Sequence, residues 1–162
     1  MARKVPPNPQ AQSYQRIMEG RRQIVHYAVM PSRASHSFLI AVVDDDESVR
    51  EALESLLKSR GYKVDAYSGA EDFLSSPRMS TTDCLILDVK LNGMSGPALQ
   101  QELIVARHSV PIIFITAHAD DHLRAQVIEK GAIDCFMKPF NDDALLATVE
   151  QTVRNRGTEA SS

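Results

Sequence analysis

The chain has 162 residues and a formal net charge of −3, a length that suits one compact domain but not two ordinary ones. Hydrophobic residues make up 43% of it, enough for a buried core, which excludes disorder along the whole chain. The charge is uneven: residues 1–36 hold six Lys/Arg and one Glu, whereas residues 37–162 hold twelve Lys/Arg and twenty Asp/Glu. A basic extension therefore precedes an acidic domain, whose acidity argues against direct nucleic-acid binding.

Residues 1–36 contain four prolines among polar and basic residues, so we expect an extension that is mostly disordered, with at most a weak helix near 12–29. Two interpretations stay open. The extension is either a basic arm for an acidic partner or membrane surface, or an inert segment, and in the second case translation could begin at Met18 or Met30.

No apolar run approaches the roughly 20 residues of a membrane-spanning helix, and no signal-peptide core follows Arg3 and Lys4. Cys84 and Cys135 lie far apart in apolar runs, without a CxxC pair, so we expect two buried, reduced thiols. A cytoplasmic protein without a membrane span is the expectation.

From residue 38 onward, short apolar runs alternate with helical patterns. We expect strands over 38–43, 62–67, 84–87, 111–115 and 133–137. We expect a helix after each strand, the second over 70–75, the fourth over 119–130 and the last beginning at the cap Asn141. Five alternating strands and helices predict an α/β fold with a doubly wound parallel sheet, covered on both faces.

Polar residues follow four of the five strands at the point where each ends: Asp44 with Asp45, then Asp88, Thr116 and Lys138. The carboxyl ends of parallel strands share one edge, where open α/β sheets bind their ligands. Carboxylates about 4 Å apart repel each other by about 4 kcal/mol at an effective dielectric constant of about 20. A hard divalent cation such as Mg²⁺ offsets that repulsion.

Five motifs in this order resemble a response regulator receiver domain, over about residues 37–155. They are Val42-Val43-Asp44-Asp45-Asp46-Glu47-Ser48-Val49-Arg50, Leu85-Ile86-Leu87-Asp88, Gly93-Met94-Ser95-Gly96, Ile115-Thr116-Ala117 and Lys138-Pro139-Phe140. The gaps of 43, 28 and 22 residues between Asp45, Asp88, Thr116 and Lys138 are also similar to those of the family, and the details look most like FixJ-type receivers.

The resemblance implies a role for each residue at the strand ends. Asp88 would be the phosphoacceptor, and its carboxylate needs no general base because it is ionised at neutral pH. Asp45 would bind Mg²⁺ directly, with Asp44 acting directly or through water, Asp88 as a further ligand and the backbone carbonyl of Lys90 as another. Thr116 would donate its hydroxyl to the phosphoryl group. Lys138 would reach Asp88 from two strands away, and its bond to Pro139 would be cis.

The same resemblance implies a flavodoxin-like strand order, 2-1-3-4-5, and a phosphoacceptor module of a two-component phosphorelay. A sensor histidine kinase would supply the phosphoryl group, and a downstream protein or a second copy, as a homodimer, would bind the face formed by 119–130, 133–137 and the last helix. We expect no enzymatic turnover beyond self-dephosphorylation. The receiver would span 37–156, with a frayed tail over 157–162, either as a stand-alone protein or as a fragment of a longer regulator.

Three features depart from the usual receiver pattern or stay open. Leu91-Asn92 lacks the usual proline, which should loosen that loop, and Cys135 stands where receivers place an aromatic switch residue. Output would then rely on backbone movement at 116–120, unless the cysteine has no signalling consequence. His118 either influences water access to the phosphoryl group or is an idle loop residue.

Two other functions are alternatives for a site of this kind. A haloacid-dehalogenase-like phosphohydrolase would use Asp88 as its nucleophile, but it needs a second Asp two residues later, where this chain has Lys90. An interaction domain of the same fold, independent of phosphorylation, would not need the complete acidic set. Asp44–Glu47 by itself could also be no more than a favourable helix N-terminus.

Overall fold

The computed structural model describes residues 37–118 and 120–159. Within them the chain forms a five-stranded parallel sheet with the strand order β2-β1-β3-β4-β5, as expected. The strands are β1 (Leu39–Val43), β2 (Lys63–Tyr67), β3 (Cys84–Asp88), β4 (Ile112–Thr116) and β5 (Asp134–Met137). The order places β3 at the centre of the sheet, between β1 and β4, and puts it two strands from β5.

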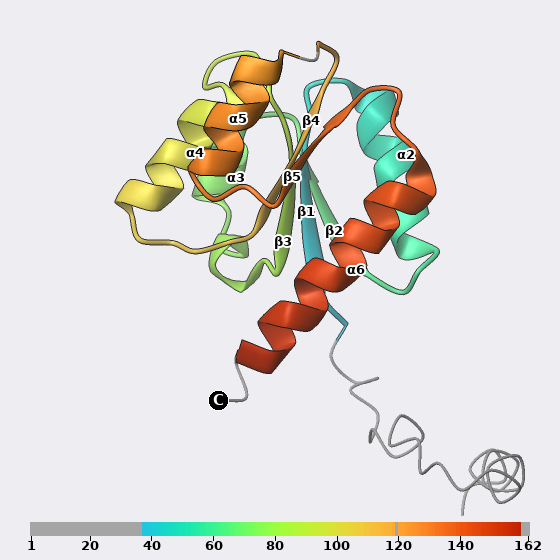
Figure 1. Ribbon diagram of the computed structural model, residues 1–162. Coiled ribbons are helices and arrows are strands. Elements are labelled where there is room, and N and C mark those ends of the chain that lie inside the picture. Colours follow the sequence, from blue (N-terminus) through green and yellow to red (C-terminus); the bar gives the residue numbers. More distant parts are fainter. Residues whose placement is uncertain (1–36, 119, 160–162) are drawn as a thin grey trace, which may run out of the picture. The chain divides into compact units, whose positions relative to one another are not determined.

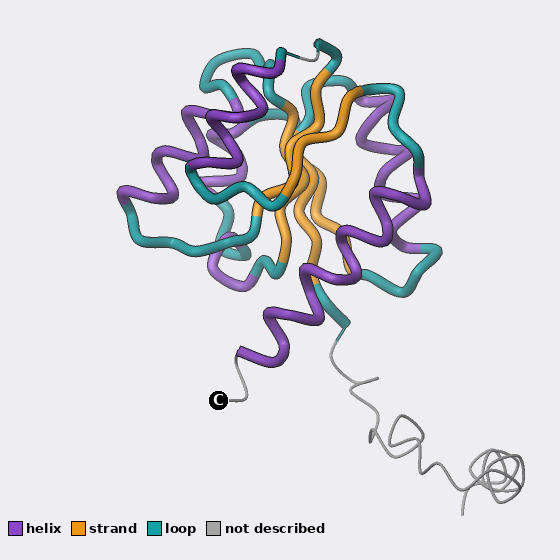
Figure 2. Tube along the Cα trace, viewed as in Figure 1, coloured by secondary structure: helices purple, strands orange, loops and turns teal. Residues whose placement is uncertain are grey.

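Helices cover both faces of the sheet (Figures 1 and 2). Helices α3, α4 and α5 lie on one face, and α2 and α6 lie on the other. The helices are α2 (Glu47–Lys58), α3 (Ala70–Ser75), α4 (Gly96–Val105), α5 (Asp121–Glu129) and α6 (Asp142–Glu159), with a short 3₁₀ turn over Met79–Thr81.

The core consists of two apolar clusters, one on each face of the sheet. The three middle strands β1, β3 and β4 are buried at every position, which explains their unbroken apolar sequences. Neighbouring residues of a strand point to opposite faces, so Cys135 joins the cluster beneath α3, α4 and α5 while Phe136 packs against the other. The two cysteines are both buried and free, as expected.

The helix boundaries differ from the sequence expectation in small ways. Helix α5 begins at Asp121, because the side chain of Asp120 accepts a hydrogen bond from the His122 N–H and caps it; Ala119 lies outside the described residues. The Asn141 side chain caps α6 as predicted, through the Ala144 N–H. Helix α6 continues to Glu159, so the tail expected from residue 157 is helical as far as 159.

The expectations for residues 1–36, and for the last residues of the tail, 160–162, lie outside the described part of the chain. Among the described residues, no helix is both long enough and apolar enough to cross a bilayer.

Candidate functional site

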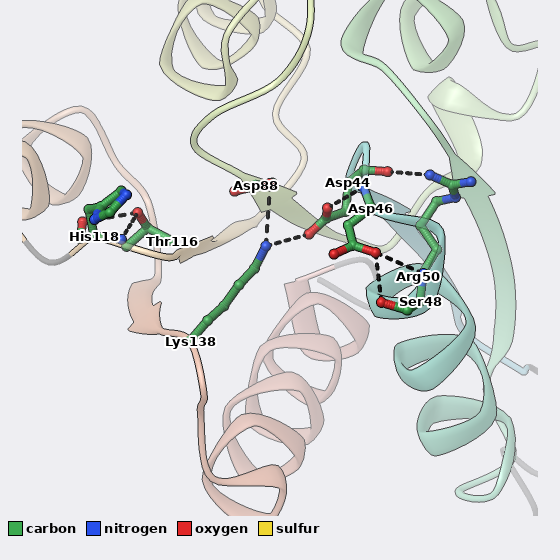
Figure 3. Close-up of polar contacts among 8 residues, drawn as sticks. All are labelled: Asp44, Asp46, Ser48, Arg50, Asp88, Thr116, His118 and Lys138. Carbon is green, nitrogen blue, oxygen red and sulfur yellow. Dashed lines mark hydrogen bonds and ion pairs between the residues drawn. The ribbon is translucent and has the colours of Figure 1, made fainter.

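The candidate site lies at the carboxyl edge of the sheet, where β1, β3, β4 and β5 deliver polar residues to one place (Figure 3). Carboxylate oxygens of Asp44, Asp45 and Asp88 lie within 4.8 Å of one another. Asp44 is fully buried and Asp88 nearly so, whereas Asp45 faces solvent. Three hard oxygen donors at this spacing, one open to solvent, suit Mg²⁺.

Lys138 extends from the end of β5 across the edge of the sheet to both buried carboxylates. Its Nζ lies 2.7 Å from Asp44 Oδ2 and 3.3 Å from Asp88 Oδ2. Asp88 is two strands away, a gap that only a long cationic side chain bridges, as the sequence suggested. The Lys138–Pro139 bond is cis, which agrees with the expectation.

The electrostatics of this group favour a further cation. Burial, and then the neighbouring Asp44 carboxylate, raise the pKa of Asp88 to about 6, although Lys138 and the backbone N–H of Lys90 oppose the rise. Burial lowers the pKa of Lys138, but the Asp44 and Asp88 carboxylates outweigh it and raise that pKa overall. One ammonium group thus faces three carboxylates, so bound Mg²⁺ would find uncompensated negative charge here.

Asp46, within the acidic run 44–47, has a structural role, as the interpretation of that run as a helix N-terminus expected. Asp46 is the N-cap of α2: its Oδ1 accepts hydrogen bonds from the Ser48 N–H at 2.9 Å and from Ser48 Oγ at 2.6 Å, and these bonds lower its pKa. Only Asp44 and Asp45 of the run therefore join Asp88. The Asp46-x-Ser48 spacing before an apolar helical pattern is the signal from which this cap could have been predicted.

Two further contacts hold Asp44 in place, and we did not predict them. The Asp46 N–H donates to Asp44 Oδ1 at 2.9 Å, and Arg50 Nη1 donates to the Asp44 carbonyl oxygen at 2.8 Å. Arg50 stands one turn into α2, where its guanidinium returns to the loop that precedes the helix (Figure 3). Arg50 ends the receiver-like motif over 42–50, but that motif assigned no contact to its half-buried side chain.

Thr116 ends β4 as expected, but its hydroxyl is engaged away from Asp88. Thr116 Oγ1 donates to the His118 carbonyl oxygen at 3.0 Å and accepts from the His118 N–H at 3.2 Å. Figure 3 shows the Thr116 side chain directed to His118 and separated from Asp88. The hydroxyl therefore stabilises the loop after β4 and would have to leave it to reach a group on Asp88.

The loop from β3 to α4 brings backbone groups close to the phosphoacceptor candidate. Gly96, the first residue of α4, lies so near that a Cβ there would stand 2.3 Å from the Asp88 carbonyl oxygen. A residue other than glycine would displace the strand end. Steric crowding therefore explains why the second glycine of the motif Gly93-Met94-Ser95-Gly96 is a glycine.

Comparisons with known proteins agree with this geometry. The profile of the response regulator receiver domain matches residues 40–150. The chain therefore belongs to the response regulator receiver domain family, the phosphoacceptor modules of two-component signal transduction. It is 40% identical over 125 residues to the response regulator protein TodT of Pseudomonas putida, covering 77% of this chain and 54% of TodT.

Other relatives support the same assignment. Nodulation protein W of Bradyrhizobium diazoefficiens is 41% identical over 126 residues, covering 77% of this chain and 56% of that protein. Among solved structures, the response regulator StyR is 39% identical with a TM-score of 0.72, covering 78% of this chain and 64% of StyR. The chain spans about half the length of the curated relatives that it matches.

Proposed function

We propose that Asp88 accepts a phosphoryl group from a sensor histidine kinase in the cytoplasm, with Mg²⁺ held by Asp44, Asp45, Asp88 and the Lys90 backbone carbonyl. One observation carries this proposal: the carboxylates of Asp44, Asp45 and Asp88 lie within 4.8 Å of one another beside the Lys138 ammonium group. Mg²⁺ held by these residues would supply positive charge that neutralises part of the charge of the incoming phosphoryl group.

The chain's own residues would divide the work of the transfer. A carboxylate oxygen of Asp88 attacks phosphorus, and the bond to the kinase imidazole breaks, leaving an aspartyl phosphate. Lys138 already contacts Asp88 and would turn to a phosphoryl oxygen, while Asp44 keeps its buried ion pair to the same ammonium group. Thr116 would exchange its bonds to His118 for a bond to a phosphoryl oxygen, which releases the loop after β4.

Cys135 fits an output that begins with this loop. The thiol is buried against the core beneath α4 and α5 and offers no ring that could swing inward when Thr116 moves. Release of the 116–120 backbone is then the first change that a partner could detect. We propose that the protein signals in this way and has no catalytic turnover beyond loss of its own phosphoryl group.

The face formed by α5, β5 and α6 is the proposed output surface, with a second copy of this chain as its occupant. It exposes Met137 on the edge strand and Ile128 on α5, 53% and 38% accessible, beside the ion pair between Arg124 and Asp134. Sedimentation velocity with and without beryllofluoride should show a larger species only with it. A monomer under both conditions would refute a second copy as the occupant of this face.

The direct test of the proposed function is acid-labile labelling by a small phosphodonor such as acetyl phosphate in the presence of Mg²⁺. The wild-type chain should be labelled, Asp88→Asn should not, and Asp142→Asn, an exposed aspartate of α6, should be labelled as the wild type is. Labelling that survives Asp88→Asn would refute the proposal. Multiple turnover of a phosphoester would favour the hydrolase, and no labelling with no Mg²⁺ binding would favour the interaction domain.

A further inference from the structure

The β3–α4 loop, residues 89–95, connects the phosphoacceptor candidate to α4 and is fixed at both ends. The Val89 N–H donates to the Ile115 carbonyl at 3.0 Å, and the Gly96 N–H donates to the Val89 carbonyl at 3.0 Å. The close approach of Gly96 to the Asp88 carbonyl fixes the second end further. Lys90 lies between these anchors, and its backbone N–H stabilises the ionised form of Asp88.

The middle of this loop is held from outside by a residue of another helix. Glu71, in the first turn of α3, accepts a hydrogen bond from the Met94 N–H at 2.7 Å between Oε1 and N. Gly93 has a φ of +80°, and a Cβ there would stand 2.7 Å from the same oxygen. One carboxylate oxygen therefore lies against two successive residues of the loop.

This contact has the chemistry of a charge-assisted hydrogen bond. The Met94 N–H is the main cause that lowers the pKa of Glu71, so the ionised carboxylate is the form that the loop stabilises. The loop in turn receives a strong acceptor for a backbone N–H that stands outside α4.

The contact between Glu71 and Met94 also compensates for a difference from the usual receiver sequence. Leu91-Asn92 lacks the proline that receivers usually place there, so the loop has more backbone freedom to lose on folding. Leu91 and Met94 pack against the core on the face of α3, α4 and α5, which orders the inner side of the loop. The Glu71 carboxylate orders its outer side.

We propose that Glu71 is a positioning residue for the phosphorylation site: through the Met94 N–H it holds the β3–α4 loop so that the Lys90 backbone faces Asp88 and the bound cation. This inference rests on the proposed function, because the loop matters only if Asp88 and its neighbours bind Mg²⁺ and accept a phosphoryl group. Glu71 itself would touch neither.

The test compares three variants of the full chain. Glu71→Ala removes the acceptor, and Glu71→Gln keeps an acceptor oxygen but no charge. Asp72→Asn, the matched control, removes a charge from the next residue, whose carboxylate accepts from Ser68 Oγ at 3.2 Å and not from the loop. Two quantities are measured by NMR in solution: hydrogen exchange of the Met94 amide without metal, and the Kd of Mg²⁺ by titration.

In Glu71→Ala we expect the Met94 amide to exchange about tenfold faster or more. We expect the Kd of Mg²⁺ to rise about threefold to tenfold, below the usual effect of an outer-shell ligand because Glu71 is exposed to solvent. Glu71→Gln should stay within about twofold of the wild type in Mg²⁺ affinity, since its amide oxygen still accepts the bond. Asp72→Asn should match the wild type in both measurements.

Unchanged Met94 exchange and unchanged Mg²⁺ affinity in Glu71→Ala would overturn the inference. So would a Mg²⁺ affinity that falls equally in Glu71→Gln and Asp72→Asn, because that result assigns the effect to net charge alone. Faster exchange with unaltered Mg²⁺ affinity would reduce Glu71 to a purely structural contact and also overturns it. If the wild-type chain neither binds Mg²⁺ nor is labelled at Asp88, the proposed function has failed, whatever the Met94 amide does.

Discussion

Among the described residues, Lys138 is the only cation that forms ion pairs with the buried carboxylates of the site, so replacing it with methionine tests the electrostatic description directly. Lys138→Met keeps an unbranched side chain of similar length but removes the charge between Asp44 and Asp88. Asp44 is fully buried and the Asp88 side chain is 8% exposed, so water cannot replace the lost ammonium group without opening the site.

The size of the expected loss in unfolding free energy follows from the buried carboxylates that Lys138→Met leaves without a partner. Removing one partner of a buried ion pair costs about 3–5 kcal/mol, because the other charge stays buried and uncompensated. The Lys138 side chain is 20% exposed, which reduces the expected loss in unfolding free energy to about 2–4 kcal/mol near neutral pH. The pKa of Lys138 is raised, so deprotonation of Lys138 itself removes this contribution only in alkali, above the ordinary value of 10.5.

The loss in unfolding free energy caused by Lys138→Met should be smaller at lower pH. Without Lys138 the pKa of Asp88, already about 6, should rise further, and the folded variant then binds a proton that the unfolded chain does not. The stability deficit should therefore shrink as the pH falls toward about 6, because Asp88 takes up its proton at a higher pH in the folded variant than in the folded wild type. Mg²⁺ should reduce it as well, because the cation takes the place of the ammonium charge.

Urea unfolding at about pH 7.5 and about pH 5.5, with and without Mg²⁺, measures these effects. Lys63→Met, on the exposed edge strand β2, serves as the control and should lose less than about 1 kcal/mol at either pH. The reasoning fails if Lys138→Met is as stable as the control near neutral pH, or if its deficit is the same at both pH values and in both metal conditions.

Three further predictions concern the same edge of the sheet. In the Mg²⁺-free protein the Asp88 carboxyl should titrate near pH 6 when followed by ¹³C NMR. Mg²⁺ should shift the titration midpoint to lower pH, because the cation favours the ionised carboxylate. A midpoint near the ordinary value of 3.8 without metal would contradict this prediction. Because its folded-state pKa is raised, Asp88 should lower the unfolding free energy as the pH rises from about 4 through about 6, and Asp88→Asn should remove that slope. Gly96→Ala should lower the unfolding free energy measured in urea by at least about 2 kcal/mol, because its Cβ would stand 2.3 Å from the Asp88 carbonyl oxygen. The control Gly69→Ala meets no atom closer than 3.4 Å, so its unfolding free energy should change little.

Much of the fold follows from local sequence patterns. The unbroken apolar runs over 84–87 and 111–115 indicated burial on both faces, and the structure buries every residue of the corresponding strands β3 and β4. The 3₁₀ turn over 79–81 was not predicted, because three polar or flexible residues carry no periodicity. The start of α5 was placed too early, since a helix end depends on a particular cap, here the Asp120 side chain.

The sequence also determined which residues belong to the site, but not how they contact one another. Order and spacing were enough to bring Asp44, Asp45, Asp88 and Lys138 to one edge, because parallel strands must end at the same side of a sheet. Packing across strands that lie far apart in the chain decides which carboxylates are buried. It also decides that Lys138 contacts Asp44 more closely than Asp88.

The tertiary structure alone decided the roles of Arg50, Glu71 and the Thr116 hydroxyl. Each makes a hydrogen bond to a backbone group, and a backbone group looks the same at every position of a sequence. Residue types and their spacing therefore predicted the acidic edge of a receiver domain. Only the folded chain shows that Glu71 of one helix holds the loop that leads from Asp88 to the next.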